Sequence, residues 1–232
     1  MSDYSYTRYL ASKKSVDDRA LNKDVVAALR RSLPVERVLE IGAGLGTMVA
    51  RLIEWDMLTR ADYTLVDVDG QLLADSHEWL RQWALGRGYE VSDELRIRGA
   101  PPSGGRRGGL KGCPVDVTVH FLQAELGYFL DHHPAQTDLL IANAFLDLVE
   151  VEVMLPRLFR LIREGGHYWF SINFDGETIF QPEHPDDAHL MAVYHRSMDE
   201  RMRYGRPAGE SKTVGHLFGH LGASIQDAGA SD

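Results

Sequence analysis

The sequence predicts an α/β fold with a doubly wound, mostly parallel sheet that is flanked by helices. Segments typical of buried strands alternate along the chain with segments of helical periodicity. A loop with three glycines follows the first of these strands, and polar side chains follow the next three. Open α/β sheets bind ligands beyond the carboxyl ends of their strands, so the same positions predict a binding site.

Composition indicates one globular domain over residues 1–232. The 232 residues are 44% hydrophobic, which is enough to bury a large core. Apolar runs stay well short of the roughly 20 residues of a membrane helix, and the N-terminus does not resemble a signal peptide, so we expect a cytoplasmic protein without a membrane partner. The net charge of −9 argues against a nucleic-acid partner. Cys113 is the single cysteine and is expected to have no function.

Residues 1–33 are predicted to form an N-terminal arm followed by a helix. Ser15 and Asp18 have the spacing of a capping box, with Ser15 as the cap. From Leu21 onward, apolar residues recur every four positions and form one face of the helix. Pro34 is expected to end it.

The first predicted strand ends in Glu40 and Ile41, and the glycine loop begins directly after it. Because glycine tolerates positive φ and has no side chain, this loop is suited to holding a ligand close to its backbone. A dinucleotide-binding fingerprint would need a third glycine at position 47, which is Thr47. Glu40, expected near the mouth of the loop, would repel a pyrophosphate. A cationic ligand is therefore predicted.

The run from Glu40 to Gly46 resembles the first motif of the class I S-adenosylmethionine-dependent methyltransferases, which have a Rossmann-like fold. The resemblance implies that S-adenosyl-L-methionine is the cofactor and S-adenosyl-L-homocysteine the product. It also implies that Glu40 approaches the cofactor's ammonium group. The loop residues implied to bind the cofactor are Gly42, Ala43, Gly44 and Gly46.

Three later strand ends agree with this resemblance. The run from Tyr63 to Val66 ends at Asp67, which the resemblance assigns to the ribose hydroxyls, with Val68 beside it. Asp69 is predicted to cap the next helix. A third strand over Val115–Leu122 leads to Ala124 and Glu125, of which Glu125 matches the acid that holds the adenine amino group. A fourth strand over 137–143 ends at Asn143, another implied cofactor contact.

Two regions outside these strands complete the predicted fold. Residues 96–112 are rich in glycine and arginine and are predicted to form a flexible basic loop. A helix around Leu158–Ile162 is expected to end at Gly165 and Gly166, and a fifth strand is expected over Tyr168–Ile172.

The N-terminal arm offers two further cofactor contacts, Arg8 and Tyr9. In the resembling family such an arm lies over the cofactor pocket as a lid. Packing of the arm's aromatic side chains on the protein surface remains an equally good interpretation.

The methyl acceptor is expected to bind the long segment over residues 174–210, since insertions here shape the acceptor pocket in the resembling family. His184 and His195 are candidates for a base, but structural roles explain them equally well, and no catalytic residue is assigned. His216 and His220 have the spacing of two metal ligands on a helix, yet no third ligand is evident. No metal is predicted.

The sequence leaves the acceptor atom open. Asn143-Ala144-Phe145-Leu146 lacks the Asn/Asp-Pro-Pro-aromatic motif that marks methylation of planar amino groups in the family. A small molecule with an oxygen, nitrogen or carbon acceptor is therefore expected. The alternatives are an NAD(P)-dependent oxidoreductase, which Thr47 and Glu40 oppose, and a non-catalytic methyltransferase-like binding protein.

Residues 223–228 are predicted to form a sixth strand, and the sequence stops four residues later. The resembling family has a last antiparallel strand between its fifth and sixth strands. We expect either a truncated chain or a sheet that is completed by a partner, for example in a homodimer.

Overall fold

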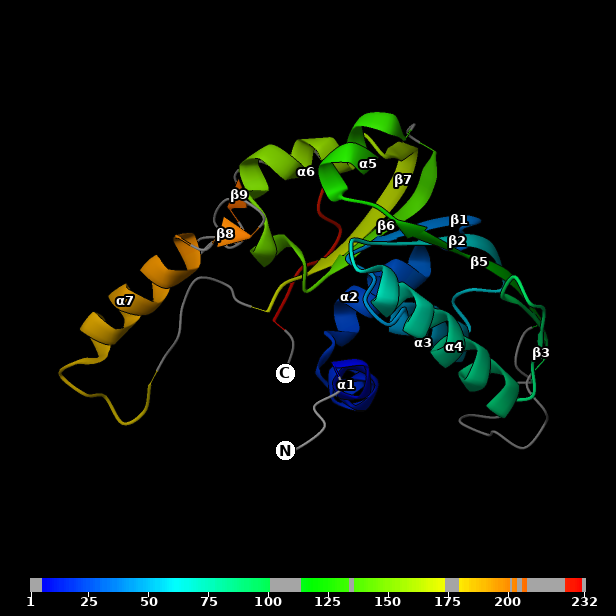
Figure 1. The fold of residues 1–232 in the computed structure, drawn as a ribbon, viewed down its shortest axis with the longest axis horizontal. Helices are drawn as coiled ribbons and strands as arrows, with labels where there is room; N and C mark the ends of the chain where they lie inside the picture. Colours follow the sequence, from blue (N-terminus) through cyan, green and yellow to red (C-terminus); the bar gives the residue numbers. More distant parts are fainter. Residues whose placement is uncertain are drawn as a thin grey trace.

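The computed structural model describes residues 6–100, 114–133, 136–173, 180–200, 202–203, 206–207 and 224–230. A seven-stranded sheet forms its centre, and helices cover both faces (Figure 1). Residues 101–112 of the predicted basic loop, Cys113, and the pair His216 and His220 lie outside the described residues. Among the described residues, none of the helices is long and apolar enough to cross a membrane.

Five of the seven strands run parallel. The strands are β1 (Arg37–Ile41), β2 (Arg60–Asp67), β3 (Glu90–Val91), β4 (Arg96–Gly99), β5 (Val115–Gln123), β6 (Thr137–Asn143) and β7 (Ile162–Ser171), in the order β3-β4-β5-β2-β1-β6-β7. From β1 the chain adds β2, then the edge hairpin β3–β4, then β5 between this hairpin and β2, and it returns to the other side of β1 for β6 and β7. This reversal between β1 and β6 is the topological switch point of a doubly wound sheet. The predicted Rossmann-like fold class is confirmed.

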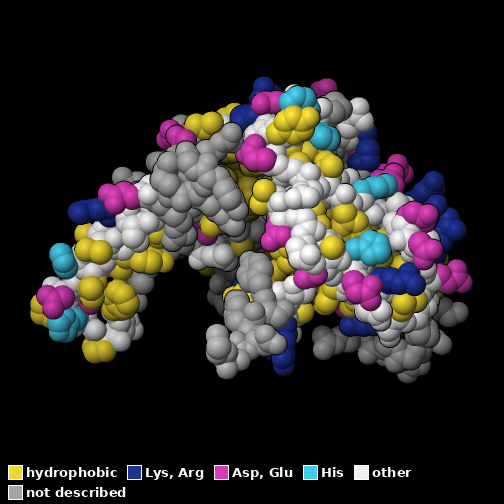
Figure 2. Space-filling model, viewed as in Figure 1, with side chains coloured by type: hydrophobic (Ala, Val, Ile, Leu, Met, Phe, Trp, Pro, Cys, Tyr) yellow, Lys and Arg dark blue, Asp and Glu magenta, His cyan; other side chains and the backbone are white. Residues whose placement is uncertain are grey.

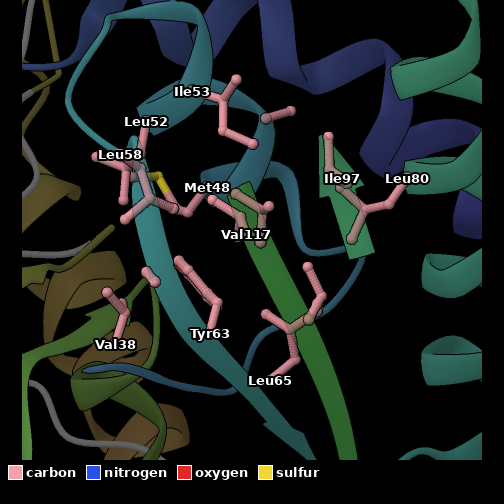
Figure 3. Close-up of a cluster of buried hydrophobic side chains, with 14 of the residues drawn as sticks. Val38, Met48, Leu52, Ile53, Leu58, Tyr63, Leu65, Leu80, Ile97 and Val117 are labelled. Carbon is pink, nitrogen blue, oxygen red and sulfur yellow. The ribbon is translucent and has the colours of Figure 1, made fainter. Parts of the chain in front are cut away.

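Helices cover the sheet because its strands are apolar on both faces. On one face lie α3 (Thr47–Glu54) and α4 (Gly70–Gly86), and on the other lie α5 (Leu126–His132) and α6 (Val151–Phe159). Side chains alternate between the two cores: Val38 packs towards α3 and α4, whereas Leu39 packs towards α5 and α6. Figure 3 shows the first core, where strand residues such as Tyr63 and Val117 meet helical ones such as Leu52.

The N-terminal part forms two helices, α1 (Tyr6–Ala20) and α2 (Lys23–Arg31), so the predicted helix start at Ser15 is wrong. Ser15 lies inside α1. The cap of the second helix is Asn22, whose Oδ1 accepts hydrogen bonds from the amides of Asp24 at 3.0 Å and Val25 at 3.1 Å. Serine and asparagine can both accept such bonds at the start of a helix. In this structure Asn22 does so, because Ser15 lies inside a helix that has already begun.

The hairpin β3–β4 corrects the prediction of a flexible loop that starts at residue 96. Arg96–Gly99 pair with β5 in an antiparallel ladder, and Arg96 and Arg98 both bind Asp116 on β5, at 2.6 Å and 3.2 Å. The Arg96 guanidinium, with further help from Arg98, lowers the pKa of Asp116 to about 2. Arg96 and Arg98, two of the charges that suggested a solvated basic loop, are therefore cross-strand partners of Asp116.

The later elements differ from the sequence prediction in their boundaries. The helix before the fifth parallel strand is α6, which ends at Phe159, and Gly165 and Gly166 lie inside β7 rather than between helix and strand. Residues 224–230 form no strand, so a sixth strand over residues 223–228 is not found among the described residues. A glycine pair does not always end a strand, and a short apolar run does not form one unless a neighbouring strand pairs with it.

Beyond β7 the chain extends away from the sheet as an arm that carries α7 (Asp187–Asp199), followed by the short strands β8 (Met202–Arg203) and β9 (Arg206–Pro207) (Figure 1). Only Met198 of α7 is buried. Leu190, Val193 and Tyr194 are about half exposed, and hydrophobic side chains are visible along this arm in Figure 2. A role of residues 174–210 in acceptor binding stays a prediction.

Candidate cofactor site

The glycine loop connects β1 to α3 at the topological switch point. Gly42, Gly44 and Gly46 have φ values of +64°, +54° and +68°, which side-chain-bearing residues rarely adopt. A methyl group on Gly42 would lie 2.5 Å from Cδ2 of Phe145, and one on Gly46 would lie 2.9 Å from both Leu65 and Ser76. Gly44 differs, since a methyl group there would meet only Leu10, at 3.7 Å. The loop is thus tightly packed at Gly42 and Gly46 and more open at Gly44.

Asp67 joins the end of β2 to the glycine loop. Its Oδ2 accepts a hydrogen bond from the amide of Gly44 at 2.9 Å, and its Oδ1 accepts one from the amide of Asp69 at 3.0 Å. The carboxylate remains partly exposed, so it has capacity for further hydrogen bonds. Asp69 caps α4 by accepting from the amides of Gln71 and Leu72, which confirms its predicted role.

Glu40 lies behind the loop rather than at its mouth. Its side chain is on the same face of β1 as Val38, is only 4% exposed, and accepts a hydrogen bond of 2.7 Å from the hydroxyl of Tyr63. Burial raises its pKa to about 7, against the opposing effects of the Tyr63 hydrogen bond and of Arg51. Contact between Glu40 and a cofactor therefore stays a prediction, and in this structure the carboxyl group supports the loop from the core.

The connections after β2 and β5 form one neighbourhood. Gln123, the last residue of β5, lies in register with Asp67, and its Nε2 donates to the carbonyl of Val68 at 3.2 Å. Ala124 donates its amide to the carbonyl of Asp67 at 3.0 Å. Val68 is 46% exposed despite being apolar, which leaves a hydrophobic surface beside Asp67. These contacts bring the two strand ends together.

Glu125 has a local structural role. Its side chain accepts a hydrogen bond from the amide of Tyr128 at 3.1 Å and thereby caps α5. Gln123 is a further residue at this edge of the sheet, and it was not among the residues predicted from the sequence. The signal that could have identified it is its position as the final residue of a strand, at the same level as Asp67.

Asn143 ends β6 on the other side of β1. Its Oδ1 accepts a hydrogen bond from the Ser171 hydroxyl at 3.0 Å, which ties β6 to the end of β7. Ala144 follows with a φ of +52°, and its amide donates to the carbonyl of Ser171 at 2.8 Å. The chain then turns so that the Phe145 ring packs on Gly42.

Helix α1 lies beside the loop and is held there by polar contacts to α3 and α4. Lys14 binds Glu54 of α3 at 2.8 Å, Arg51 of α3 binds Asp18, and Thr7 binds Asp75 of α4. These contacts place Leu10 near Gly44. Tyr9 is 46% exposed and Arg8 is also exposed, so their predicted contacts with the cofactor remain predictions.

The candidate bases lie on the arm beyond β7. His184 precedes α7, where its Nδ1 accepts from the amide of Asp186, and His195 lies within α7. The structure gives neither histidine a contact with the glycine loop among the described residues, and no base is assigned. Over all the residues that the structure describes, no group of three or more histidine, cysteine or acidic residues is placed to hold a metal ion.

A cavity of about 630 Å³ lies elsewhere, between α2, α6, β7 and residues 224–227. Leu29, Phe159 and Trp169 are among its lining residues, which include none of the predicted cofactor residues. It borders β7 from Ile162 to Trp169, whereas ligands of open α/β sheets bind beyond the carboxyl ends of the strands. We therefore place the candidate site at the glycine loop.

The charges at the carboxyl edge indicate which ligand charge this edge favours. Residues 42–47, 67–70, 123–125 and 143–145 form this edge and include the acids Asp67, Asp69 and Glu125, but neither lysine nor arginine. Such an edge attracts a cationic ligand and repels a pyrophosphate. The apolar surface of Val68 adds a place for a planar ring.

No protein-family model matches the chain, and a search of curated proteins found no match. Several solved structures are similar to it. The plantazolicin methyltransferase BpumL in complex with SAH has 15% identity and a TM-score of 0.44, covering 72% of this chain and 53% of that protein. A SAM-dependent methyltransferase from Thiobacillus denitrificans, in complex with S-adenosyl-L-homocysteine, has 13% identity and a TM-score of 0.41, covering 79% and 61%.

A third similar structure is the [4+2]-cyclase SpnF, with 15% identity and a TM-score of 0.38, covering 60% of this chain and 39% of that protein. In all three cases the chain spans less than two thirds of the other protein's length. Fold alone does not determine the reaction. The chain is thus similar to solved structures that are described as methyltransferases or as a cyclase.

Proposed function

We propose that the protein binds S-adenosyl-L-methionine and transfers its methyl group to a small-molecule acceptor. The acidic carboxyl edge around the glycine loop is the observation that carries this proposal, because this cofactor has two cationic groups and no phosphate. The residues present fit such a cofactor: the loop is open at Gly44, Asp67 is partly exposed, and Val68 offers an apolar surface.

From the order of the strands in the sheet we infer the direction in which the cofactor would lie. Asp67 would hold the ribose hydroxyls, and the adenine ring would lie over Val68 and beside Gln123, between the ends of β2 and β5. Since β1 and β6 follow on the other side of β2, the methionine part would extend across the glycine loop towards Asn143. Each end of the molecule would then have its own set of contacts.

When bound, the cofactor supplies a methyl group that is activated by the positive charge on sulfur. The chain's own residues would orient it through Asp67 and the glycine loop and exclude water around the methyl group. The acceptor atom attacks in line, so the main requirement on the protein is alignment. A proton that the acceptor loses would pass to a side chain or to solvent.

Calorimetric titration of the chain with S-adenosylmethionine, S-adenosylhomocysteine and NAD tests this proposal. We expect both sulfur ligands to bind and NAD not to bind. Replacement of Asp67 by alanine should weaken the binding of both sulfur ligands by roughly 10- to 100-fold, because hydrogen bonds to a charged group are lost. Binding of NAD alone would identify an oxidoreductase instead, and binding of none of the three would contradict the proposal.

Asp69→Ala is the matched control. Asp69 lies two residues from Asp67 and is exposed, but its carboxylate caps α4. The control should lose about 1 kcal/mol of stability through the missing cap. Its affinity for the sulfur ligands should fall clearly less than that of Asp67→Ala, because it removes one charge of the edge but no proposed contact with the ribose. Circular dichroism checks that Asp67→Ala is folded, since Asp67 also holds Gly44.

A further inference from the structure

Phe145 touches the glycine loop from the opposite side of the switch point. Its ring packs so closely on Gly42 that a methyl group on this glycine would lie 2.5 Å from Cδ2 and 3.2 Å from Cε2. The residue as a whole is only partly buried, and it lies in the connection that follows β6 at the carboxyl edge. Phe145 belongs to neither β6 nor α6, and its position results from the short connection after β6.

A strained backbone sets this position. Ala144 has a φ of +52°, which lies in the left-handed region. A residue with a side chain lowers the stability of the protein when it adopts this conformation. Two contacts with Ser171 hold the turn: the Ala144 amide donates to its carbonyl, and its hydroxyl donates to Asn143. Such strain persists where the surroundings enforce it, and it is common at functional sites.

The sheet order places this ring beside one particular part of the proposed cofactor. The adenosine end is assigned to the ends of β5 and β2, and β1 and β6 come next in the sheet. The sulfur atom connects the ribose to the methionine chain, so it would lie over the end of β1. Gly42 is the residue at that point, and Phe145 is the aromatic side chain packed on it.

We propose that Phe145 contacts the sulfonium group and makes the site prefer S-adenosylmethionine over S-adenosylhomocysteine, an inference that rests on the proposed function. An aromatic ring attracts a cation at its face. In the reaction the bond between sulfur and the methyl carbon breaks, its electron pair stays on sulfur, and the acceptor atom bonds to the methyl carbon. The product is a neutral thioether, so the attraction is lost and product release is favoured.

Separate titrations of the two sulfur ligands test this inference. The ligands share the adenosine, ammonium and carboxylate groups and differ only in the methyl group and charge at sulfur. For Phe145→Leu we expect the dissociation constant of S-adenosylmethionine to rise about tenfold and that of S-adenosylhomocysteine to change less than about twofold. Phe145→Tyr keeps an aromatic ring and should leave the ratio of the two constants unchanged.

Pentafluorophenylalanine at position 145 provides a test that keeps the packing on Gly42. It has nearly the shape of phenylalanine, but its ring face no longer attracts cations, so the ratio should change as it does in Phe145→Leu. Phe170→Leu is the control. Phe170 is a partly buried aromatic residue of β7 that packs against Phe159 and Tyr168, and its loss should leave the ratio unchanged.

The outcomes separate this inference from the proposed function. Equal weakening of both ligands by the leucine and pentafluoro variants would mean that Phe145 only supports Gly42, and the inference would be overturned while the function stands. Failure of the unmodified chain to bind either ligand would overturn both. A selective loss of S-adenosylmethionine affinity in both variants supports the inference.

Discussion

Replacing Gly42 by alanine is expected to destabilise the fold by about 3 kcal/mol, combining positive-φ strain with overpacking, and to abolish binding of S-adenosylmethionine. The new methyl group would lie 2.5 Å from the Phe145 ring, so either the ring or the loop must move. Both movements change the carboxyl edge where the cofactor is proposed to lie. Urea unfolding measures the stability change, and calorimetry measures the binding.

Gly44→Ala is the matched control for this prediction. Gly44 has a similar φ of +54°, but a methyl group there would meet only Leu10, at 3.7 Å. The control therefore carries the backbone strain without the clash, and we expect a loss of only about 1 kcal/mol. If the two variants lost the same stability, the packing of Phe145 on Gly42 would not matter.

Glu40→Gln is expected to raise stability by less than about 1 kcal/mol at pH 5 and by about 2–3 kcal/mol at pH 8. Burial raises the pKa of Glu40 from 4.5 to about 7 in the folded protein, so the folded state favours the protonated form. The stability that this preference contributes is complete below pH 4.5 and is lost as the pH rises to about 7. Glutamine cannot ionise and can still accept the hydrogen bond from Tyr63.

Urea unfolding of both proteins at the two pH values provides the measurement. The difference between variant and unmodified chain is the informative quantity, because other carboxyl groups titrate equally in both. The nearby charges of Arg51 and Asp67 act in opposite directions on Glu40, and neither changes in the variant. A difference that stays constant between pH 5 and pH 8 would show that Glu40 is ionised in the folded protein throughout this range.

The sequence was most informative where local chemistry allows one solution. Three glycines at alternating positions predicted a loop with positive φ, which Gly42, Gly44 and Gly46 have. Asp69 precedes a helix and caps it as expected. The apolar run of β6 predicted a strand covered on both faces, and Leu139 and Leu140 are buried in different cores.

Prediction was weaker where distant contacts decide the structure. Arg96 and Arg98 look like loop residues until Asp116 on β5 provides their partner. Glu40 was expected at the loop mouth, because the sequence does not show that its side chain lies on the core face with Tyr63. Gln123 was overlooked because only the pairing of β5 with β2 places it beside Asp67. Each of these depends on register between strands that are far apart in the chain.

Hydrogen–deuterium exchange with and without S-adenosylhomocysteine tests most directly whether the ligand site lies at the carboxyl edge. We expect the ligand to slow exchange in residues 42–47, 67–70, 123–125 and 143–145, which belong to four separate connections that meet only in the folded sheet. Protection confined to α2, α6 and β7 up to Trp169, around the cavity that Leu29 and Trp169 line, would contradict this account and place the ligand there instead.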